Sequence, residues 1–516
     1  MPATSDFDPP RFSILEHRLH FRLAQARLPF HFGVMTLKEA WQVTLVVTIE
    51  DAQGRRAQGV AGDTLAPRWF DKDLSRSIPQ NLLDLVDAAD AAGAAFTAEA
   101  KPLTLFERWR PAYNAAFAAS RASGRPDLVG SYGAALFERA LWSALCRLTG
   151  QPFHAVLRAN LGGLVISGLH PDVPGLADFT PADLLPTEPR RRIVLRHTVG
   201  GADPLTRADD CAGDPADGRP YTLEENIRRF GLYAFKLKIF GRLEEDLARL
   251  GAIARVLDAT VPAPTPGRLA LDPAAAAAPY FVTIDGNESY ADFAAVEEIV
   301  ARLRADPALK NFCRAILFIE QPLNRAVSFD PVHRAAIARL NSFKPIVIDE
   351  ADQNLDSFRQ AADLGYRGVS AKNCKGVIKS LANRALMTAF AQAGRGAFVQ
   401  SGEDLTNLPV VPLGQDLATL ASLGILHAER NGHHFYAGAE HLPAELRAAA
   451  AAEQPGLYEL DRGRLFVRIA EGLLNLDQVV GAGYGLTPAL EKRCAASDGT
   501  LDAAAWRAQI EKENQP

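Results

Sequence analysis

Residues 281–287 of the chain read FVTIDGN, a short apolar run that ends on Asp285 and is followed at once by Gly and Asn. Similar runs lie on both sides of it: YAFKLKIFG (233–241), AILFIEQP (315–322), PIVIDEA (345–351) and GVSAKNCKG (368–376). Runs rich in Val, Ile, Phe and Leu that end in Gly, Pro or Asn are typical of strands in a fully buried parallel sheet. Each run also carries charge at or near its end. We therefore expect these charges to gather where the strands end.

Charged side chains at the ends of buried strands require partners, because an unpaired buried ion costs several kcal/mol. The acidic members of the set are Asp285, Glu320 and Asp349, and the basic members are Lys236, Lys238 and Lys372. Oxygen ligands of this type suit a hard divalent cation such as Mg²⁺, with Mn²⁺ as an alternative. The pattern therefore favours a metal site that faces basic side chains, although each carboxylate alone is also compatible with a helix cap or a buried ion pair.

Three more runs of the same kind extend the series outward: RIVLRHTVGG (192–201), GAFVQSGE (396–403) and GILHAERN (424–431). Amphipathic stretches such as FAAVEEIVARLRA (293–305) separate them. Eight strand and helix units predict an α/β protein with a (β/α)₈ TIM-like barrel, in which the active site lies at the C-terminal ends of the strands.

The rest of the chain predicts a second domain, as expected for 516 residues. Residues 11–65 have the pattern of a three-stranded meander, and helical spacing follows from about 78 to 150. A stretch rich in Pro, Gly and Asp at 165–192 marks a boundary, and residues 261–280 form a Pro- and Ala-rich insertion. Two aromatic segments, around Phe30 to Met35 and Trp69 to Lys72, are expected to be lids that contact the distal part of a substrate.

Composition excludes several classes of protein. A net charge of −5 and a pI near 6.2 give no basic excess for binding a phosphate backbone, so we expect no nucleic-acid partner. The five cysteines are widely spaced and form no CxxC, which argues against a disulfide framework or a zinc knuckle. The N-terminus lacks the pattern of a secretion signal, and no run reaches the about 18–20 apolar residues that span a bilayer. We expect a cytoplasmic protein with no membrane partner.

The strand that carries Lys236 and Lys238 places both side chains on one face, because strand side chains alternate. Two lysines therefore enter one cavity, unless this is an edge strand guarded against aggregation by Lys. Crowding of these ammonium groups beside a metal is expected to lower the pKa of the base among them.

The succession of KxK, DxN, IEQP, DE and a late strand-terminal Lys resembles the enolase superfamily, in its mandelate racemase/muconate-lactonizing enzyme family and on the muconate-lactonizing and dipeptide-epimerase side. The resemblance covers most of the chain. It implies a modified barrel at 166–436 beneath an α+β capping domain at 1–165, and we expect segment 437–516 to pack back on that domain. It further implies that Asp285, Glu320 and Asp349 hold Mg²⁺, that Lys238 and Lys372 exchange protons on opposite faces of the substrate, and that Lys236 assists the substrate carboxylate.

Neighbouring polar residues are candidates for binding substrate or for supporting the site. Asn287 shares the face of Asp285, Glu350 is expected to pair with Lys372 or Lys375, and His197 is a pocket candidate on the first strand. The seventh and eighth strand ends add four more candidates, which are Ser401, Glu403, His427 and Glu429.

Two departures from the family bear on the substrate. The eighth strand reads HAERN where dipeptide epimerases carry DxD, and Lys372 stands where sugar dehydratases use a late His. Both activities are disfavoured. The leading hypothesis is an isomerase that abstracts the proton α to a small-molecule carboxylate through an enediolate and racemises or epimerises it. The alternatives are cycloisomerisation or β-elimination through the same intermediate, and a non-catalytic carboxylate-binding relative. Substrate identity and homo-oligomer formation stay open.

Overall fold

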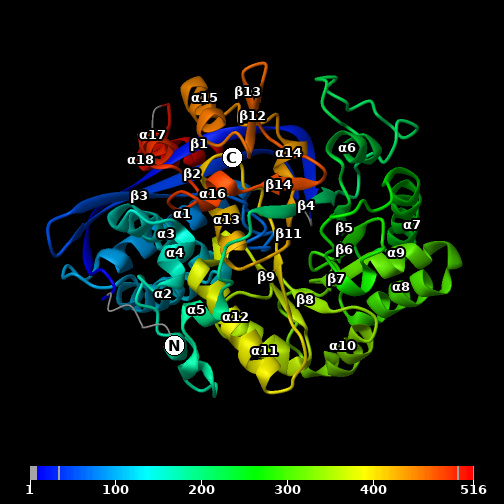
Figure 1. Ribbon diagram of the computed structural model, residues 1–516, viewed down its shortest axis with the longest axis horizontal. Helices are drawn as coiled ribbons and strands as arrows, with labels where there is room; N and C mark the ends of the chain where they lie inside the picture. Colours follow the sequence, from blue (N-terminus) through cyan, green and yellow to red (C-terminus); the bar gives the residue numbers. More distant parts are fainter. Residues whose placement is uncertain (1–7, 33–34, 497–498, 515–516) are drawn as a thin grey trace.

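A computed structural model describes residues 8–32, 35–496 and 499–514. Its centre is a closed barrel of eight parallel strands, in which the eighth strand pairs with the first (Figure 1). All eight strand predictions are confirmed. The strands are β4 (Arg192–Val199), β5 (Ala234–Lys238), β6 (Phe281–Asp285), β7 (Ile316–Glu320), β8 (Ile346–Ile348), β9 (Gly368–Ala371), β10 (Val399–Gly402) and β11 (His427–Arg430).

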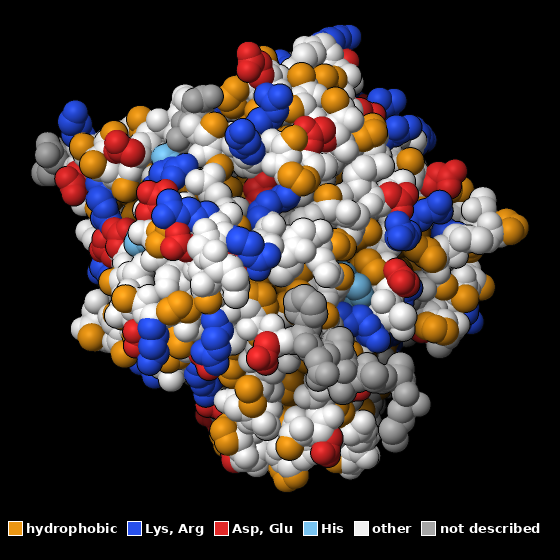
Figure 2. Space-filling view, turned by 60° about the vertical axis from the view of Figure 1, so that its left-hand side comes forward, with side chains coloured by type: hydrophobic (Ala, Val, Ile, Leu, Met, Phe, Trp, Pro, Cys, Tyr) orange, Lys and Arg blue, Asp and Glu red, His pale blue; other side chains and the backbone are white. Residues whose placement is uncertain are grey.

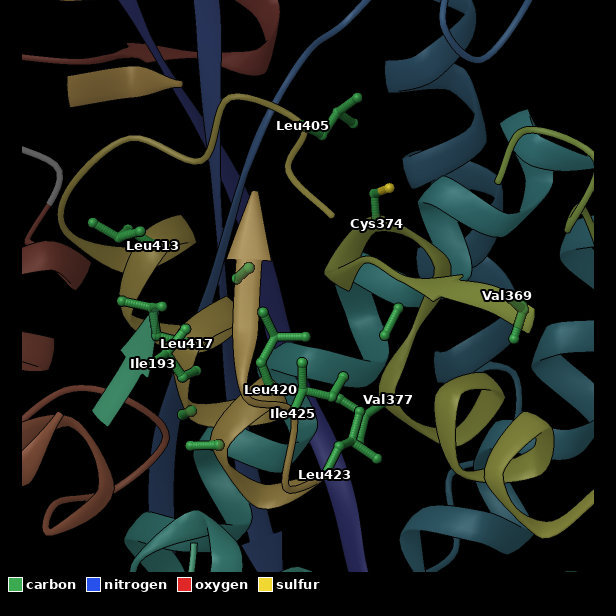
Figure 3. Packing of buried hydrophobic residues seen from close by; sticks show 14 of the residues in the cluster. Ile193, Val369, Cys374, Val377, Leu405, Leu413, Leu417, Leu420, Leu423 and Ile425 are labelled. Atoms are coloured by element: carbon green, nitrogen blue, oxygen red, sulfur yellow. The ribbon is translucent and has the colours of Figure 1, made fainter. Parts of the chain in front are cut away.

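Helices alternate with these strands and cover the outside of the barrel (Figure 1). They are α6 (Leu223–Phe230), α7 (Leu243–Thr260), α8 (Phe293–Ala305), α9 (Lys310–Ala315), α10 (Arg334–Asn341), α11 (Ser357–Leu364), α12 (Val377–Gln392), α13 (Val411–Ser422) and the short α14 (Gly432–Phe435). α6 begins at a capping box, in which Thr222 and Glu225 satisfy each other's backbone N–H groups. The apolar faces of such helices close the core. Figure 3 shows Leu413, Leu417 and Leu420 of α13 packed among buried residues of the strands.

The N-terminal segment forms an antiparallel sheet with helices on one side. Its strands are β1 (Phe12–Phe32), β2 (Met35–Asp51) and β3 (Arg56–Thr64), and its helices are α1 (Ile78–Thr97), α2 (Leu105–Ala122) and α3 (Asp127–Thr149). α3 is buried along most of its length between the sheet and the barrel. Gly59 of β3 permits this close approach, since a Cβ there would clash with the backbone of Ala140 and Ala144.

The first hairpin is longer than the sequence suggested. Pairing of β1 with β2 continues past Gln25 through a register shift to Phe30, so the expected long connection is mostly strand. Residues 33–34, in the first proposed lid, lie outside the described residues.

One part of the segment after the barrel packs on the N-terminal sheet, and another part packs on the barrel. β15 (Leu501–Asp502) pairs with β1, and α18 (Ala503–Glu513) stacks Trp506 on Phe21 with ring centroids 4.4 Å apart. β14 (Leu473–Asn475) pairs instead with barrel strand β4. The remaining elements are α15 (Ala444–Glu453), the hairpin β12 (Tyr458–Asp461) and β13 (Arg464–Val467), α16 (Asp477–Val480) and α17 (Pro488–Ala495).

The Pro- and Ala-rich insertion lies between α7 and the start of β6. That position is at the N-terminal end of the barrel, away from the strand ends that carry the charges. Over the part of the chain that is described, no helix is both long and apolar enough to span a membrane. Basic and acidic side chains are interspersed over the face shown in Figure 2.

Candidate active site

The register of the barrel sheet brings the charged strand ends together. Lys238 of β5 lies beside Asp285 of β6, which in turn lies beside Glu320 of β7. The ammonium of Lys238 is 2.6 Å from Asp285 Oδ2. The predicted row of charges therefore forms at the C-terminal end of the barrel, where the active sites of such barrels lie.

Lys236 lies at the centre of four carboxylates. Its Nζ is 2.9 Å from Asp285 and 2.8 Å from Glu320. It is also 2.6 Å from Glu403 and 3.0 Å from Glu429. Burial alone would lower the pKa of Lys236, but these carboxylates outweigh burial and raise it well above its usual value. Crowding of two ammonium groups was expected to lower a lysine pKa. At Lys236 the carboxylates outweigh that effect, and the side chain is held as an ammonium ion.

Asp349 forms a second centre of charge across the barrel. Its two carboxylate oxygens lie 2.7 Å from Lys372 Nζ and 3.0 Å from Lys375 Nζ. Burial alone would raise the pKa of Asp349, but the two lysines outweigh burial and hold it well below its usual value. In the reverse direction, Asp349 overcomes the effect of burial on Lys372 and raises its pKa.

Trp69 covers this second centre from the capping domain. Lys372 Nζ lies 4.4 Å from the centroid of the Trp69 ring, and Lys375 Nζ lies 5.8 Å from it. An aromatic face at this distance stabilises an ammonium ion and keeps water from one side of it. The second proposed lid segment thus contacts Lys372 directly.

One cavity is lined by both domains. The barrel contributes Lys238, Lys372 and Glu429, and the capping domain contributes Trp69 and Phe30. Lys238 and Lys372 belong to strands on opposite sides of the closed barrel, since β5 and β9 are four strands apart. The further lining residues are Leu37, Thr64, Ala66, Asn287, Asp404, Leu405, Thr406 and Asn431. Cationic groups thus face the cavity from two walls, and apolar groups cover part of its cap side.

Two candidates from the last strands belong to the charged interior. Glu429 contacts Lys236, accepts a hydrogen bond from Thr198 at 2.8 Å and lines the cavity. Glu403 pairs with Lys236 and with Arg196. Arg196 is fully buried inside the barrel, 2.6 Å from His427 Nδ1.

Arg196 is a residue that the sequence analysis missed, and His197 was chosen in its place. Strand side chains alternate between the two faces, so Arg196 and Thr198 of β4 lie on the inner face of the barrel, as Lys236 and Lys238 of β5 do. His197 therefore points outward, where its Nδ1 lies 3.0 Å from His433 Nε2, and it is absent from the lining of the cavity. The proposal of His197 as a pocket residue was wrong for this reason.

Ser401 and His427 lie deeper in the barrel than the cavity. Ser401 donates to Glu403, and His427 contacts Arg196, with its ring 6.3 Å from that of Phe318. Their contacts hold Glu403 and Arg196 in place beneath the cavity.

The partner of Glu350 differs from the expected one. Glu350 accepts a hydrogen bond from Asn287 Nδ2 at 3.0 Å, whereas Lys372 and Lys375 pair with Asp349. Asn287 also donates its backbone N–H to Asp285 at 2.8 Å, so it connects two carboxylates of the site.

A contact between the domains lies next to Asn287 and carries no signal in a single sequence. Glu288 is buried and pairs with Lys72 of the capping domain at 2.5 Å and with Arg325 of the barrel at 2.8 Å. Arg325 also donates to the backbone carbonyls of Trp69 and Phe70. These bonds hold the Trp69 segment against the barrel.

The predicted metal ligands match a hard cation in chemistry but are paired with lysines. Asp285, Glu320 and Asp349 end adjacent strands, and burial and the charges of Asp285 and Glu403 raise the pKa of Glu320 well above its usual value. In residues 8–32, 35–496 and 499–514, however, no three Asp, Glu, His or Cys side chains are placed to hold a metal ion. The donor set fits Mg²⁺, and ligation requires these carboxylates to turn from the ammonium groups towards the metal.

No protein-family model matches the chain, and no curated protein matches it either. Solved structures do match it over nearly their whole length. A muconate lactonizing enzyme from Pseudomonas fluorescens, complexed with muconolactone, is 16% identical with a TM-score of 0.52, over 93% of this chain and 97% of that one. The chain has the enolase-superfamily fold.

Two further matches have the same fold. A dipeptide epimerase from Enterococcus faecalis V583, complexed with Mg and the dipeptide L-Leu-L-Tyr, is 13% identical with a TM-score of 0.55, over 92% of this chain and 99% of that one. An enolase from Bradyrhizobium, complexed with magnesium and mandelic acid, is 16% identical with a TM-score of 0.53, over 95% and 99% of the two chains. These structural matches establish the shared fold alone. A function for this chain has to be argued from the residues of its own site.

Proposed function

We propose that the protein is an enzyme of the enolase superfamily that removes the proton α to a carboxylate and returns a proton from the opposite face, as a racemase or epimerase. The observation that carries the proposal is that Lys238 and Lys372 line one cavity from opposite sides of the barrel. Two proton carriers on opposite walls match a planar intermediate that gains a proton on either face.

Mg²⁺ is the proposed cofactor, with Asp285, Glu320 and Asp349 as its ligands and Mn²⁺ as an alternative. Mg²⁺ occurs in the structures of the dipeptide epimerase and the Bradyrhizobium enolase. A bound divalent cation supplies positive charge beside the substrate carboxylate, which stabilises the enediolate that forms when the α-proton leaves.

The chain's own residues then have separate tasks. Lys372, covered by Trp69, holds a proton at Nζ and delivers it to the α-carbon. Lys238 takes the α-proton on the other wall, and the two roles reverse for the opposite enantiomer. Lys236 stays protonated among its carboxylates and adds positive charge below the substrate carboxylate. Trp69 keeps water from Lys372.

Cycloisomerisation or β-elimination is the second candidate, and the unequal setting of the two lysines favours it. Both lysines have an ion pair, but Lys372 also lies against an aromatic face, with its Nζ 4.4 Å from the centroid of the Trp69 ring, and this suits a lysine that stays an ammonium ion. In that mechanism Lys238 alone moves protons.

The test is a nuclear magnetic resonance screen for α-deuterium uptake from D₂O, with Mg²⁺ or Mn²⁺, over N-acyl amino acids, dipeptides, hydroxy acids and muconates. We expect exchange in at least one class, and its loss in Lys238→Ala for the enantiomer whose α-proton faces Lys238. The matched control is Lys310→Ala, at an exposed lysine of α9. A racemase exchanges both enantiomers, and Lys372→Ala then stops exchange of one. A lyase or cycloisomerase gives a new product instead. Absence of exchange together with absence of Mg²⁺ binding by calorimetry would favour the non-catalytic relative.

A further inference from the structure

Gln321 follows β7 directly, and its backbone turns out of the barrel sheet. The residue is 1% exposed, and its φ of 32° lies in the left-handed region, which is uncommon for residues other than Gly. Its backbone carbonyl accepts the N–H of Glu288 at 2.9 Å, from the loop after β6. A backbone conformation of this kind persists only where the surrounding structure imposes it. The contacts of Gln321 therefore show what this turn achieves.

The side chain of Gln321 takes the place that its backbone leaves beside β8. The N–H of Gln321 donates to the carbonyl of Val347 at 2.8 Å, and in a regular parallel ladder the next bond would run from the N–H of Asp349 to the carbonyl of Gln321. Instead, Oε1 of Gln321 accepts the N–H of Asp349 at 2.8 Å and the N–H of Ala351 at 3.0 Å. Since β8 ends at Ile348, these bonds fix the backbone beyond the strand.

The amide of Gln321 is itself held in one orientation. Its Nε2 donates to the carbonyl of Leu323 at 2.7 Å and to Oγ of Ser328 at 3.0 Å. Only the nitrogen of an amide donates and only its oxygen accepts, so these two acceptors keep Oε1 turned towards Asp349. Every one of these bonds is shielded from water, and replacing the amide leaves buried N–H groups without a partner.

One residue thus connects the three strand ends that carry the proposed metal ligands. Gln321 directly follows Glu320, its side chain holds the backbone of Asp349, and its carbonyl holds Glu288 in the loop that begins after Asp285. The relative positions of the three carboxylates therefore depend on the bonds of Gln321 as well as on the sheet.

We propose that Gln321 is a positioning residue, which sets the separation of Asp285, Glu320 and Asp349 and through it the affinity of the site for Mg²⁺. This inference rests on the proposed function, in which these carboxylates hold the metal. Mg²⁺ requires nearly ideal octahedral geometry at about 2.0–2.1 Å, so its binding is sensitive to small shifts of its ligands. Gln321 is absent from the lining of the catalytic cavity, and it acts through Asp349 and not on the substrate.

The experiment measures Mg²⁺ binding by calorimetry in Gln321→Met, whose side chain is of similar length and accepts hydrogen bonds only weakly. We expect the affinity for Mg²⁺ to fall by about 10- to 100-fold, the usual cost of losing a residue that orients a metal ligand. The matched control is Gln415→Met on α13. Gln415 is also fully buried, and its Nε2 donates to the carbonyl of Val60 at 2.7 Å. The control therefore loses a buried amide away from the three strand ends and should bind Mg²⁺ as the wild type does.

A conservative variant keeps the test open if Gln321→Met does not fold, as checked by thermal unfolding without metal. Gln321→Asn keeps the amide but is one methylene shorter, so its oxygen no longer reaches both N–H groups, and its affinity for Mg²⁺ should also fall. The inference is overturned if the folded Gln321 variants bind Mg²⁺ as tightly as the wild type, or if Gln415→Met loses as much affinity as they do. Failure of the wild type to bind Mg²⁺ would overturn the proposed cofactor together with the inference, so the wild type distinguishes the two failures.

Discussion

The mouth of the barrel and the contact of α3 with the barrel both bury charged side chains, but they balance those charges differently. At the mouth, Lys236 is shared by four carboxylates, and the cluster continues through Lys238 and Glu429 to a cavity. At α3, each charge has its own partners. Arg139 pairs with Asp63 at 2.6 Å, and both side chains are almost wholly buried.

Glu138 of α3 shows the same dedicated pairing. It accepts hydrogen bonds from the indole N–H groups of Trp109 and Trp142 and from the backbone N–H of Ile378 at the start of α12. Burial of a charge therefore does not mark a functional site by itself. Charges that are shared among several groups and face a cavity do, because their arrangement changes when a ligand or a proton arrives.

The largest expected effect is at the mouth. Lys238→Arg keeps the positive charge near Asp285, but a guanidinium is not deprotonated in proteins, so it cannot act as a base. We expect α-proton exchange to fall by about 10²- to 10⁴-fold, measured by nuclear magnetic resonance in D₂O. Lys310→Arg on the exposed face of α9 is the control and should exchange at the normal rate. Normal exchange by Lys238→Arg would remove Lys238 from the mechanism.

The second prediction compares the removal of one buried cation from each of the two regions. Lys236→Met leaves its carboxylates without their shared cation, and Arg139→Met leaves Asp63 without its partner. Each is expected to lower the free energy of unfolding by about 3–5 kcal/mol, measured by urea denaturation. The two should differ in activity, since only Lys236→Met also loses exchange per folded molecule. Equal loss of exchange in both variants would contradict the distinction between the regions.

The third prediction concerns pH and the α3 contact. Burial, the largest cause, raises the pKa of Glu138 from 4.5 to about 7. The folded state therefore holds a proton that the unfolded state has lost between those pH values. The contribution of Glu138 to stability is complete below pH 4.5 and falls by about 3 kcal/mol as the pH rises to about 7. In Glu138→Gln this slope should be missing, as measured by urea denaturation at a series of pH values. An unchanged slope would exclude Glu138 as its source.

The smallest expected effect is at Trp69, where the cap meets the mouth. Trp69→Leu removes the aromatic face above Lys372, and a cation–π contact of about 0.5–2 kcal/mol corresponds to a loss of about 2- to 30-fold in exchange rate. Trp69→Phe keeps an aromatic ring and should lose less. Equal rates in both variants would show that the ring does not act on Lys372.

Much of the barrel was predictable, because each strand carries a local signal. The runs around Asp285, Glu320 and Asp349 are apolar until they end, and all eight strands form where such runs occur. The capping sheet followed from its alternation, except between residues 24 and 32, where a register shift lengthens β1 beyond the regular pattern.

The candidate site was predictable where a residue's neighbours follow from its strand and not where they come from elsewhere. Alternation placed Lys236 and Lys238 inside, and the same rule, applied to β4, would have selected Arg196 and not His197. The partners of Glu350 and Glu288 had no local signal, since Asn287, Lys72 and Arg325 come from three distant segments.

The sequence by itself determined the order of strands and which charges stand at their ends, because these depend on residues a few positions apart. Only the tertiary structure decided how those charges are paired: Lys236 with four carboxylates, Asp349 with two lysines, and Arg430 between two aspartates. Pairing depends on distances across the barrel and between domains, and closing the barrel is what sets those distances.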